Sequence, residues 1–326
     1  MKEQILKILT DCNGYVSGEA LSQQLGVSRT AVWKVINKLK EEGYRIDSVR
    51  NKGYCLTATT TELVEDAIKL RLSETSIFKK VELYETLDST NSAAKRLWQN
   101  GDQEAMLVLS REQTAGKGRR GRQWLSPKDQ GVFMSMLLTP DIEPVHGSML
   151  TLVAGLAVCE AIEELTGLEP MIKWPNDLVL NNKKICGILT EMSAEVDFIH
   201  YVVVGIGVNV SQEEFDDQIE TMATSIGQVW GRTLSRPDLI GKIIEKFEVH
   251  YKEFLLVKDL SFLVRAYNAR CINVGAKLRV SSRNATIEGE GIGVNPDGTL
   301  QIRLADGTIT SVNAGEVSVR GLYGYV

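Results

Sequence analysis

The sequence predicts a multidomain α+β protein, and three observations lead to this fold class. The first 60 residues combine helical periodicity with an excess of positive charge. The region from about residue 65 to 270 contains strand-like apolar runs, a long apolar helix and short turns between consecutive strands. From residue 272 onward, short strands alternate with turns that contain Asp-Gly. We therefore expect three domains, over residues 1–62, 63–271 and 272–326.

Composition and charge favour a soluble, cytoplasmic protein. Hydrophobic residues make up 43% of the chain, no apolar run approaches the roughly 20 residues of a membrane span, and the N-terminus does not resemble a signal peptide. The five cysteines form no CxxC pair and the three histidines lie far apart, so we expect no metal ligands and no disulfide framework. Residues 1–60 carry nine Lys or Arg and six Asp or Glu, a net +3 that leaves −8 elsewhere. This asymmetry indicates a distinct N-terminal domain with an acidic partner.

Three short helices are expected in the N-terminal domain. The first, over residues 3–11, places four apolar side chains on one side: Ile5, Leu6, Ile8 and Leu9. The second runs through EALSQQL and stops at Gly26, because glycine adopts the left-handed conformation at a helix end without strain. Ser28 is the expected N-cap of the third helix, whose buried face consists of Val32, Val35, Ile36 and Leu39.

This order of helices, with a cationic exposed face on the third, is the plan of a helix-turn-helix domain, which inserts a helix into the DNA major groove. The segment YRIDSVRNKGYCL alternates apolar and polar residues around a turn at 51–53, which predicts the β-hairpin of a winged helix. Residues 57–64 would be the linker to the next domain. The expected DNA contacts are Arg29, Thr30, Lys34, Asn37, Lys38, Arg50 and Lys52. The alternative is a three-helix interaction domain with a solvated basic face.

The central domain is expected to contain a sheet and a long helix. Strands are predicted at residues 81–86, 105–112 and 131–138, and an apolar helix at about 147–166 ends at Gly167. Further strands are predicted in MIKW, DLVL, KICGILTEM and HYVVVGIGVNV. Because strands joined by short turns pair as antiparallel hairpins, we expect a mixed or antiparallel sheet rather than a doubly wound one.

The stretch AGKGRRGRQW, residues 115–124, is rich in glycine and cations. It is not a P-loop, since Gly118 stands where Ser or Thr would hold magnesium, and GIGVN at 205–209 lacks the third glycine of a dinucleotide fingerprint. A glycine-rich loop can nevertheless bring backbone N–H groups and cations to an anion. The candidate anion-binding residues are Gly116, Lys117, Gly118, Arg119, Arg120, Gly121 and Arg122. A solvated surface loop is the alternative.

Two further segments gather polar groups that suit a small-molecule site. LDSTNSAAKRL places Ser89, Thr90 and Asn91 at a helix start, where side chains and free N–H groups can bind a polar molecule. KWPNDL at 173–178 concentrates polar groups around a proline, and the next hairpin presents two lysines at 183–184. The simpler interpretations are a capped helix for the first segment and a tight turn for the second.

Taken together, DSTN, EQTAGKGRRGRQW, KWPNDL, KKICGILTE and GIGVNV, in this order behind a winged helix, resemble the bacterial biotin protein ligases. The resemblance covers nearly the whole chain and is closest to the bifunctional type that also represses biotin genes. It implies a central ligase domain of class II synthetase-like type and a C-terminal SH3-like β-barrel. The alternatives are a non-catalytic ligand-sensing transcription factor and a lipoate ligase.

The same resemblance implies the reaction and the partners. Such ligases form biotinyl-5′-AMP from biotin and ATP with Mg²⁺, and then transfer biotin to a lysine of a biotin carboxyl carrier protein. In the bifunctional type, biotinyl-5′-AMP would also be the corepressor of a homodimer on operator DNA.

Residue roles follow from the resemblance position by position. Lys184 would neutralise the carboxylate and phosphate, Arg119 would hold the adenylate, and Asp177 would orient or deprotonate the acceptor lysine. Biotin would be bound by Ser89, Thr90, Asn91, Gln113, Lys117, Gly118, Arg119, Lys184 and Trp124. The ATP or adenylate side would consist of the seven candidate anion-binding residues with Asn176 and Asn209. The family usually has Arg where Lys117 stands, and Trp230 is the nearest candidate for stacking on adenine.

Overall fold

The structure is a computed structural model that describes residues 1–12, 14–58, 61–217, 219–281, 286–314 and 318–321, with the backbone alone for 58 and 318–321. Contacts divide the chain into two units: Met1–Glu74 with Ser235–Gly241, and Thr75–Leu234 with Lys242–Val326. The division into domains at residues 62 and 271 stays a prediction, since the contacts group residues 63–74 with the N-terminal unit.

The first unit contains three helices, a hairpin and a further short helix. Their bounds are α1 (Lys2–Asp11), α2 (Gly18–Leu25), α3 (Arg29–Glu41), β1 (Arg45–Val49), β2 (Gly53–Ala58) and α4 (Glu65–Lys69). Gly26 ends α2 in the left-handed conformation with φ 65°, and the Ser28 side chain caps α3 by accepting a hydrogen bond from Ala31 N at 3.2 Å. The winged helix-turn-helix predicted from these signals is confirmed.

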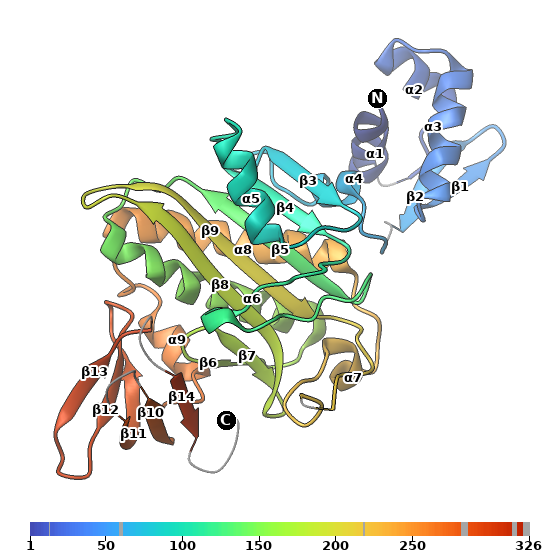
Figure 1. The fold of residues 1–326 in the computed structure, drawn as a ribbon. Helices are drawn as coiled ribbons and strands as arrows, with labels where there is room; N and C mark the ends of the chain where they lie inside the picture. Colours follow the sequence, from blue (N-terminus) through green and yellow to red (C-terminus); the bar gives the residue numbers. More distant parts are fainter. Residues whose placement is uncertain (13, 59–60, 218, 282–285, 315–317, 322–326) are drawn as a thin grey trace. The chain divides into compact units, whose positions relative to one another are not determined.

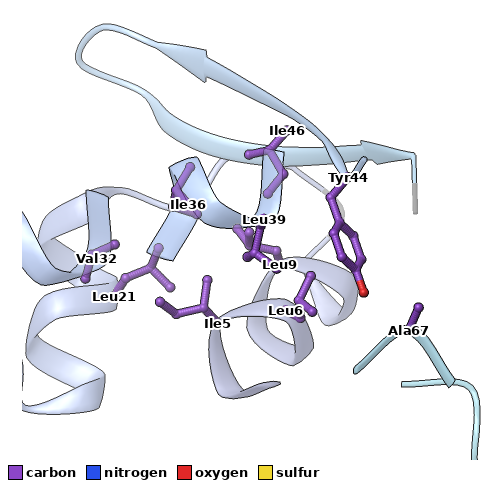
Figure 2. Packing of buried hydrophobic residues seen from close by; sticks show 10 residues of the cluster. All are labelled: Ile5, Leu6, Leu9, Leu21, Val32, Ile36, Leu39, Tyr44, Ile46 and Ala67. Carbon is purple, nitrogen blue, oxygen red and sulfur yellow. The ribbon is translucent and has the colours of Figure 1, made fainter. Parts of the chain in front are cut away.

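One buried cluster holds this unit together, and Figure 2 shows its side chains meeting from the helices and the hairpin. Its members are Ile5, Leu6, Leu9, Leu21, Val32, Ile36, Leu39, Tyr44, Ile46 and Ala67. Isolated helices of fewer than about 12 residues are marginal in water, whereas burying one large apolar side chain contributes about 1.5–3 kcal/mol. The cluster therefore stabilises helices that would not persist alone.

A seven-stranded mixed sheet forms the centre of the second unit, in the order β3-β4-β5-β9-β8-β7-β6. The bounds are β3 (Lys80–Tyr84), β4 (Met106–Ser110), β5 (Gly131–Leu138), β6 (Met171–Lys173), β7 (Asp177–Leu180), β8 (Lys183–Ala194) and β9 (Ile199–Asn209). β3 and β4 are parallel because α5 (Thr90–Gln99) crosses between them, and each other neighbouring pair is antiparallel. The mixed sheet expected from the sequence is confirmed.

Helices α5 and α6 (Leu150–Thr166) cover opposite faces of this sheet, as Figure 1 shows. The side chains of β8 point alternately toward these two faces. Ile188 lies near Gly155 of α6, whereas Glu191 contacts Asn91 of α5. A 3₁₀ turn, η2 (Pro144–Met149), precedes α6.

We expected no apolar segment long enough to cross a membrane, but residues 144–166 meet that criterion among the described residues. Since 72% of the apolar window is buried inside the protein, we assign this segment as a core helix.

Helix α8 (Arg236–Val257) was not predicted from the sequence, and its residues 242–257 belong to the second unit. Its second part lies beside α6, since Lys242 and Lys246 pair with Glu164 at 2.7 and 2.6 Å. Two shorter helices are α7 (Ile226–Trp230) and α9 (Val264–Arg270).

The C-terminal segment forms a five-stranded antiparallel sheet in the order β13-β12-β11-β10-β14. The bounds are β10 (Lys277–Ser281), β11 (Thr286–Val294), β12 (Leu300–Arg303), β13 (Ile309–Val312) and β14 (Ser318–Gly321). The two Asp-Gly turns place Gly298 and Gly307 at φ 81° and 86°, a region that glycine occupies readily. The predicted sheet domain is confirmed, and its closure into an SH3-like barrel stays a prediction.

Candidate active site

Three glycines form part of a pocket on the α5 face of the central sheet. Gly187 of β8 pairs with Gly207 of β9, and Gly205 lies on the same face two residues away. A Cβ at Gly187 or Gly207 would lie 2.9 or 2.5 Å from the Trp124 indole, and one at Gly205 would lie 2.0 Å from Asn91 Oδ1. Side chains that approach so closely restrict the three positions to glycine.

The glycine-rich stretch forms a short hairpin that carries Trp124 onto these glycines. Lys117 pairs with Gln123, and the Gly118 N–H donates to the Arg122 carbonyl at 2.7 Å. Its tip is a 3₁₀ turn, η1 (Arg119–Gly121). The loop predicted to bind an anion therefore has an ordered backbone, with cations along it.

Lys184 enters the pocket at a β-bulge. The register of β7 against β8 shifts around Ile185, so Lys184 lies on the same face as Gly187, three residues further on. The Lys184 ammonium is 2.6 Å from Asp177 Oδ1 and 5.2 Å from the centre of the Trp124 ring. A cation thus lies against a carboxylate and an aromatic face, at a place where a negatively charged ligand could replace the carboxylate.

Arg119 connects the hairpin to this cation. Its guanidinium donates to Asn176 Oδ1 at 2.7 Å and to the Ala314 carbonyl, while Asn176 Nδ2 donates to Asp177 Oδ1 at 3.0 Å. Burial lowers the pKa of Arg119, an effect that Asp177 opposes, and a guanidinium stays charged in proteins. The arrangement joins two cations through Asn176 and Asp177 and can stabilise an anion between them.

A polar wall lines the pocket at the start of α5. Ser89 is the N-cap by position, but its side chain makes no capping hydrogen bond. The simpler interpretation of this segment, a capped helix, is therefore wrong. Instead, the Thr90 N–H donates to Gln113 Oε1 at 2.8 Å, and Gln113 Nε2 donates to Ser126 Oγ at 2.7 Å. Ser89, Thr90 and Asn91 are buried and line the pocket, so their polar atoms face the wall and the pocket rather than bulk solvent.

Ten of the predicted site residues line this pocket: Ser89, Thr90, Asn91, Gln113, Lys117, Gly118, Arg119, Trp124, Asn176 and Lys184. Six lie outside its lining: Gly116, Arg120, Gly121, Arg122, Asp177 and Asn209. Of these, Asp177 reaches the pocket through Lys184, whereas Asn209 is buried and donates to the Thr224 carbonyl at 3.0 Å. Trp230 also lies outside the lining and has Arg232 over its ring at 5.6 Å.

Sequence reasoning assigned no role to six further lining residues: Gly187, Ile188, Leu189, Gly205, Ile206 and Gly207. The available signal was glycine within strands, which marks a close approach of other atoms. The sequence contains that signal in GIGVN and in KKICGILTE.

The predicted DNA contacts lie on the surface of the first unit. The exposed ones are Arg29, Thr30, Lys34, Lys38, Arg50 and Lys52, and Asn37 is half-buried. Sequence reasoning did not single out Trp33, whose side chain is 54% exposed. Since residues three and four apart share a helix face, Trp33 lies between Thr30 and Asn37 on the exposed face of α3.

Cations, a polar wall and a glycine floor around one pocket, on a chain with a winged helix-turn-helix, define a class of protein: an enzyme for small anionic substrates that also carries a DNA-binding domain. Comparisons with known proteins identify the family to which the chain belongs. Family models match for the biotin/lipoate A/B protein ligase family at residues 83–209, an HTH domain at 2–55, and the biotin protein ligase C-terminal domain at 277–320.

Relatives that align with nearly the whole chain are consistent with these family matches. The chain is 36% identical over 310 residues to the bifunctional ligase/repressor BirA of Bacillus subtilis, covering 94% of this chain and 95% of that one. It is 29% identical to the protein of the same name from Escherichia coli, covering 93% and 92%. A solved biotin protein ligase from Aquifex aeolicus, in complex with biotin and ATP, matches 75% of this chain and 100% of its own, with TM-score 0.66 and 30% identity. The chain belongs to the biotin protein ligase family, in its bifunctional ligase/repressor group.

Proposed function

We propose that the chain forms biotinyl-5′-AMP from biotin and ATP and transfers biotin to a lysine of a biotin carboxyl carrier protein. The observation that carries this proposal is the convergence of Lys184 and Arg119 on a pocket whose other wall is polar and uncharged. One end of the pocket suits a carboxylate beside a phosphate, and the other suits an uncharged ring that donates and accepts hydrogen bonds. Biotin and ATP present these groups.

The first step brings two anions together, the biotin carboxylate and the α-phosphate of ATP. Lys184 is held by Asp177 in the structure, and we propose that it turns to the carboxylate and phosphate oxygens when they enter. Arg119, fixed by Asn176, neutralises the charge that develops on the phosphate. Positioning and charge together lower the barrier, and pyrophosphate is released.

Mg²⁺ is proposed to arrive with the nucleotide. Among the residues that the structure describes, no group of three His, Cys, Asp or Glu side chains could hold a metal ion. Magnesium is commonly bound through substrate phosphates with few protein ligands, and it would withdraw charge from them.

In the second step, the acceptor lysine attacks the biotinyl carbonyl carbon of the adenylate as a neutral amine, so an amide forms and AMP leaves. Once Lys184 has moved to the anion, Asp177 becomes available to orient or deprotonate that amine. The hairpin would exclude water from the adenylate until the acceptor arrives, with Lys117 making a less rigid contact than arginine would.

Transfer of labelled biotin tests the enzymatic proposal. With ATP, magnesium and a biotin carboxyl carrier domain, the wild-type chain is expected to label the carrier, and omission of ATP is expected to abolish the label. A parallel incubation with lipoate in place of biotin tests substrate class. Labelling by lipoate and not by biotin would contradict the proposal.

We also propose that the chain represses biotin genes in the cytoplasm as a homodimer on operator DNA, with biotinyl-5′-AMP as corepressor. The support is the exposed cationic face of α3 and the hairpin tip. A gel shift with a biotin-gene promoter is expected to show at least about 10-fold tighter binding when biotin and ATP are both present, since a ligand that favours the DNA-binding state shifts the equilibrium toward it. Equal binding with and without the two substrates would refute the corepressor role.

A further inference from the structure

A half-buried carboxylate lies behind the polar wall and takes no part in the steps above. Glu191 of β8 accepts a hydrogen bond from Asn91 Nδ2 at 2.8 Å and pairs with Lys95 Nζ at 2.5 Å. Asn91 and Lys95 lie one turn apart on α5, so both reach the same carboxylate. Burial raises the pKa of Glu191, but its hydrogen bonds with Lys95 and Asn91 outweigh burial and lower it overall, which keeps Glu191 ionised.

This carboxylate fixes the orientation of the Asn91 amide. Asn91 Nδ2 donates both to Glu191 Oε2 and to the Leu189 carbonyl at 3.2 Å, and both partners can only accept. A flipped amide would place its oxygen against two acceptors. Asn91 Oδ1 is therefore left to accept a hydrogen bond, and Ser135 Oγ lies 2.6 Å from it.

The orientation is passed on through two hydroxyl groups. Ser135 is fully buried and lies 2.6 Å from Asn91 Oδ1 and 2.8 Å from Thr90 Oγ1. A hydroxyl has one proton, and Asn91 Oδ1 can only accept, so the Ser135 proton is directed to Asn91. Thr90 then receives no proton from Ser135, and its own single proton goes to one of its two partners in the wall, Ser135 Oγ or Gln113 Oε1 at 3.2 Å. Both lone pairs of Thr90 are therefore left, so its oxygen can accept a hydrogen bond from a ligand in the pocket that it lines.

We propose that Glu191, held by Lys95, is a positioning residue that makes Thr90 a hydrogen-bond acceptor toward the bound substrate. The preferred substrate then carries an N–H at this point, which in biotin is an N–H of the ureido ring. The inference rests on the proposed function for the identity of the ring, while the direction of the hydrogen bonds follows from Glu191, Asn91 and Ser135.

A double-mutant cycle between Glu191 and Thr90 tests this role. Glu191→Met is expected to raise the Kd for biotin about 10-fold, the effect of one misdirected hydrogen bond, and to raise KM more than it lowers kcat. In a Thr90→Val background the same substitution is expected to change Kd less than about 2-fold, because the hydroxyl that it acts through is gone. Equal effects in both backgrounds would show a merely structural role and overturn the inference.

Two further variants extend the test, and the first remains informative if Glu191→Met unfolds. Glu191→Gln retains an acceptor for Asn91 and is expected to restore most of the affinity, whereas Glu191→Met in a Ser135→Ala background is expected to change the Kd less than about 2-fold, because the hydroxyl that links Asn91 to Thr90 is already absent. Glu82→Met is the matched control, because Glu82 also pairs with a lysine on a strand of this sheet, Lys80 at 3.5 Å, and lies outside the pocket lining. It should leave the Kd unchanged. Absence of biotin binding by the wild type would refute the proposed function itself. Equal effects of Glu191→Met in the wild-type and Thr90→Val backgrounds would refute only the role of Glu191.

Discussion

Replacing Lys184 with alanine is expected to slow formation of biotinyl-5′-AMP about 100- to 1000-fold, the usual cost of losing one preorganised group that stabilises developing charge. Lys184 is the cation that the bulge at Ile185 directs into the pocket, where its ammonium contacts Asp177 and the Trp124 ring. Without it, the carboxylate of biotin and the phosphates of ATP would meet with less compensating charge. Single-turnover release of pyrophosphate measures this step directly.

Lys183 provides a matched control one residue away. Its ammonium donates to the Glu220 carbonyl at 3.2 Å and lies outside the pocket lining, so Lys183→Ala should keep the wild-type rate within about 2-fold. Thermal unfolding of both variants separates chemistry from folding. Equal rates for Lys184→Ala and the wild type would remove Lys184 from the reaction, and equal slowing by both substitutions would indicate a general charge effect instead.

The N-terminal unit was predictable because its signals are local. Gly26 ends a helix through its own backbone conformation, and Ser28 caps the next helix through an atom three residues away. The apolar spacing of α3 likewise identifies the face that is buried. Each inference needs only residues within one or two helical turns, so the sequence alone is sufficient.

Much of the pocket was not predictable from local signals. Gly187 and Gly207 are separated by 20 positions in the chain, and their shared role depends on pairing across β8 and β9 and on Trp124 lying over both. The bulge at Ile185 also depends on the register of β7. Family resemblance identified Lys184 and Arg119, but their alignment through Asn176 and Asp177 became visible only in the folded chain.

Placing a methyl group at Gly207 is expected to weaken biotin binding about 5- to 150-fold. The new Cβ would lie 2.5 Å from Trp124 Nε1, and the indole cannot retreat freely because it also lies against Gly187. In the free protein the methyl group displaces the indole, and returning the indole to the pocket wall for the ligand costs about 1–3 kcal/mol, the usual cost of overpacking, which corresponds to the stated range in Kd. Calorimetric titration of Gly207→Ala with biotin gives the value.

The position of the methyl group, rather than the loss of a glycine, should cause this effect. Gly155→Ala in α6 is the control, because a Cβ there would have nothing nearer than Ile188 Cδ1 at 3.8 Å, and alanine in a helix interior is more stable than glycine by about 0.5–1 kcal/mol. Its biotin affinity should be unchanged. In a Trp124→Phe background, which lacks the indole nitrogen, the penalty of Gly207→Ala should shrink. A penalty of the same size in that background would mean that the methyl group acts through the strand and not through Trp124.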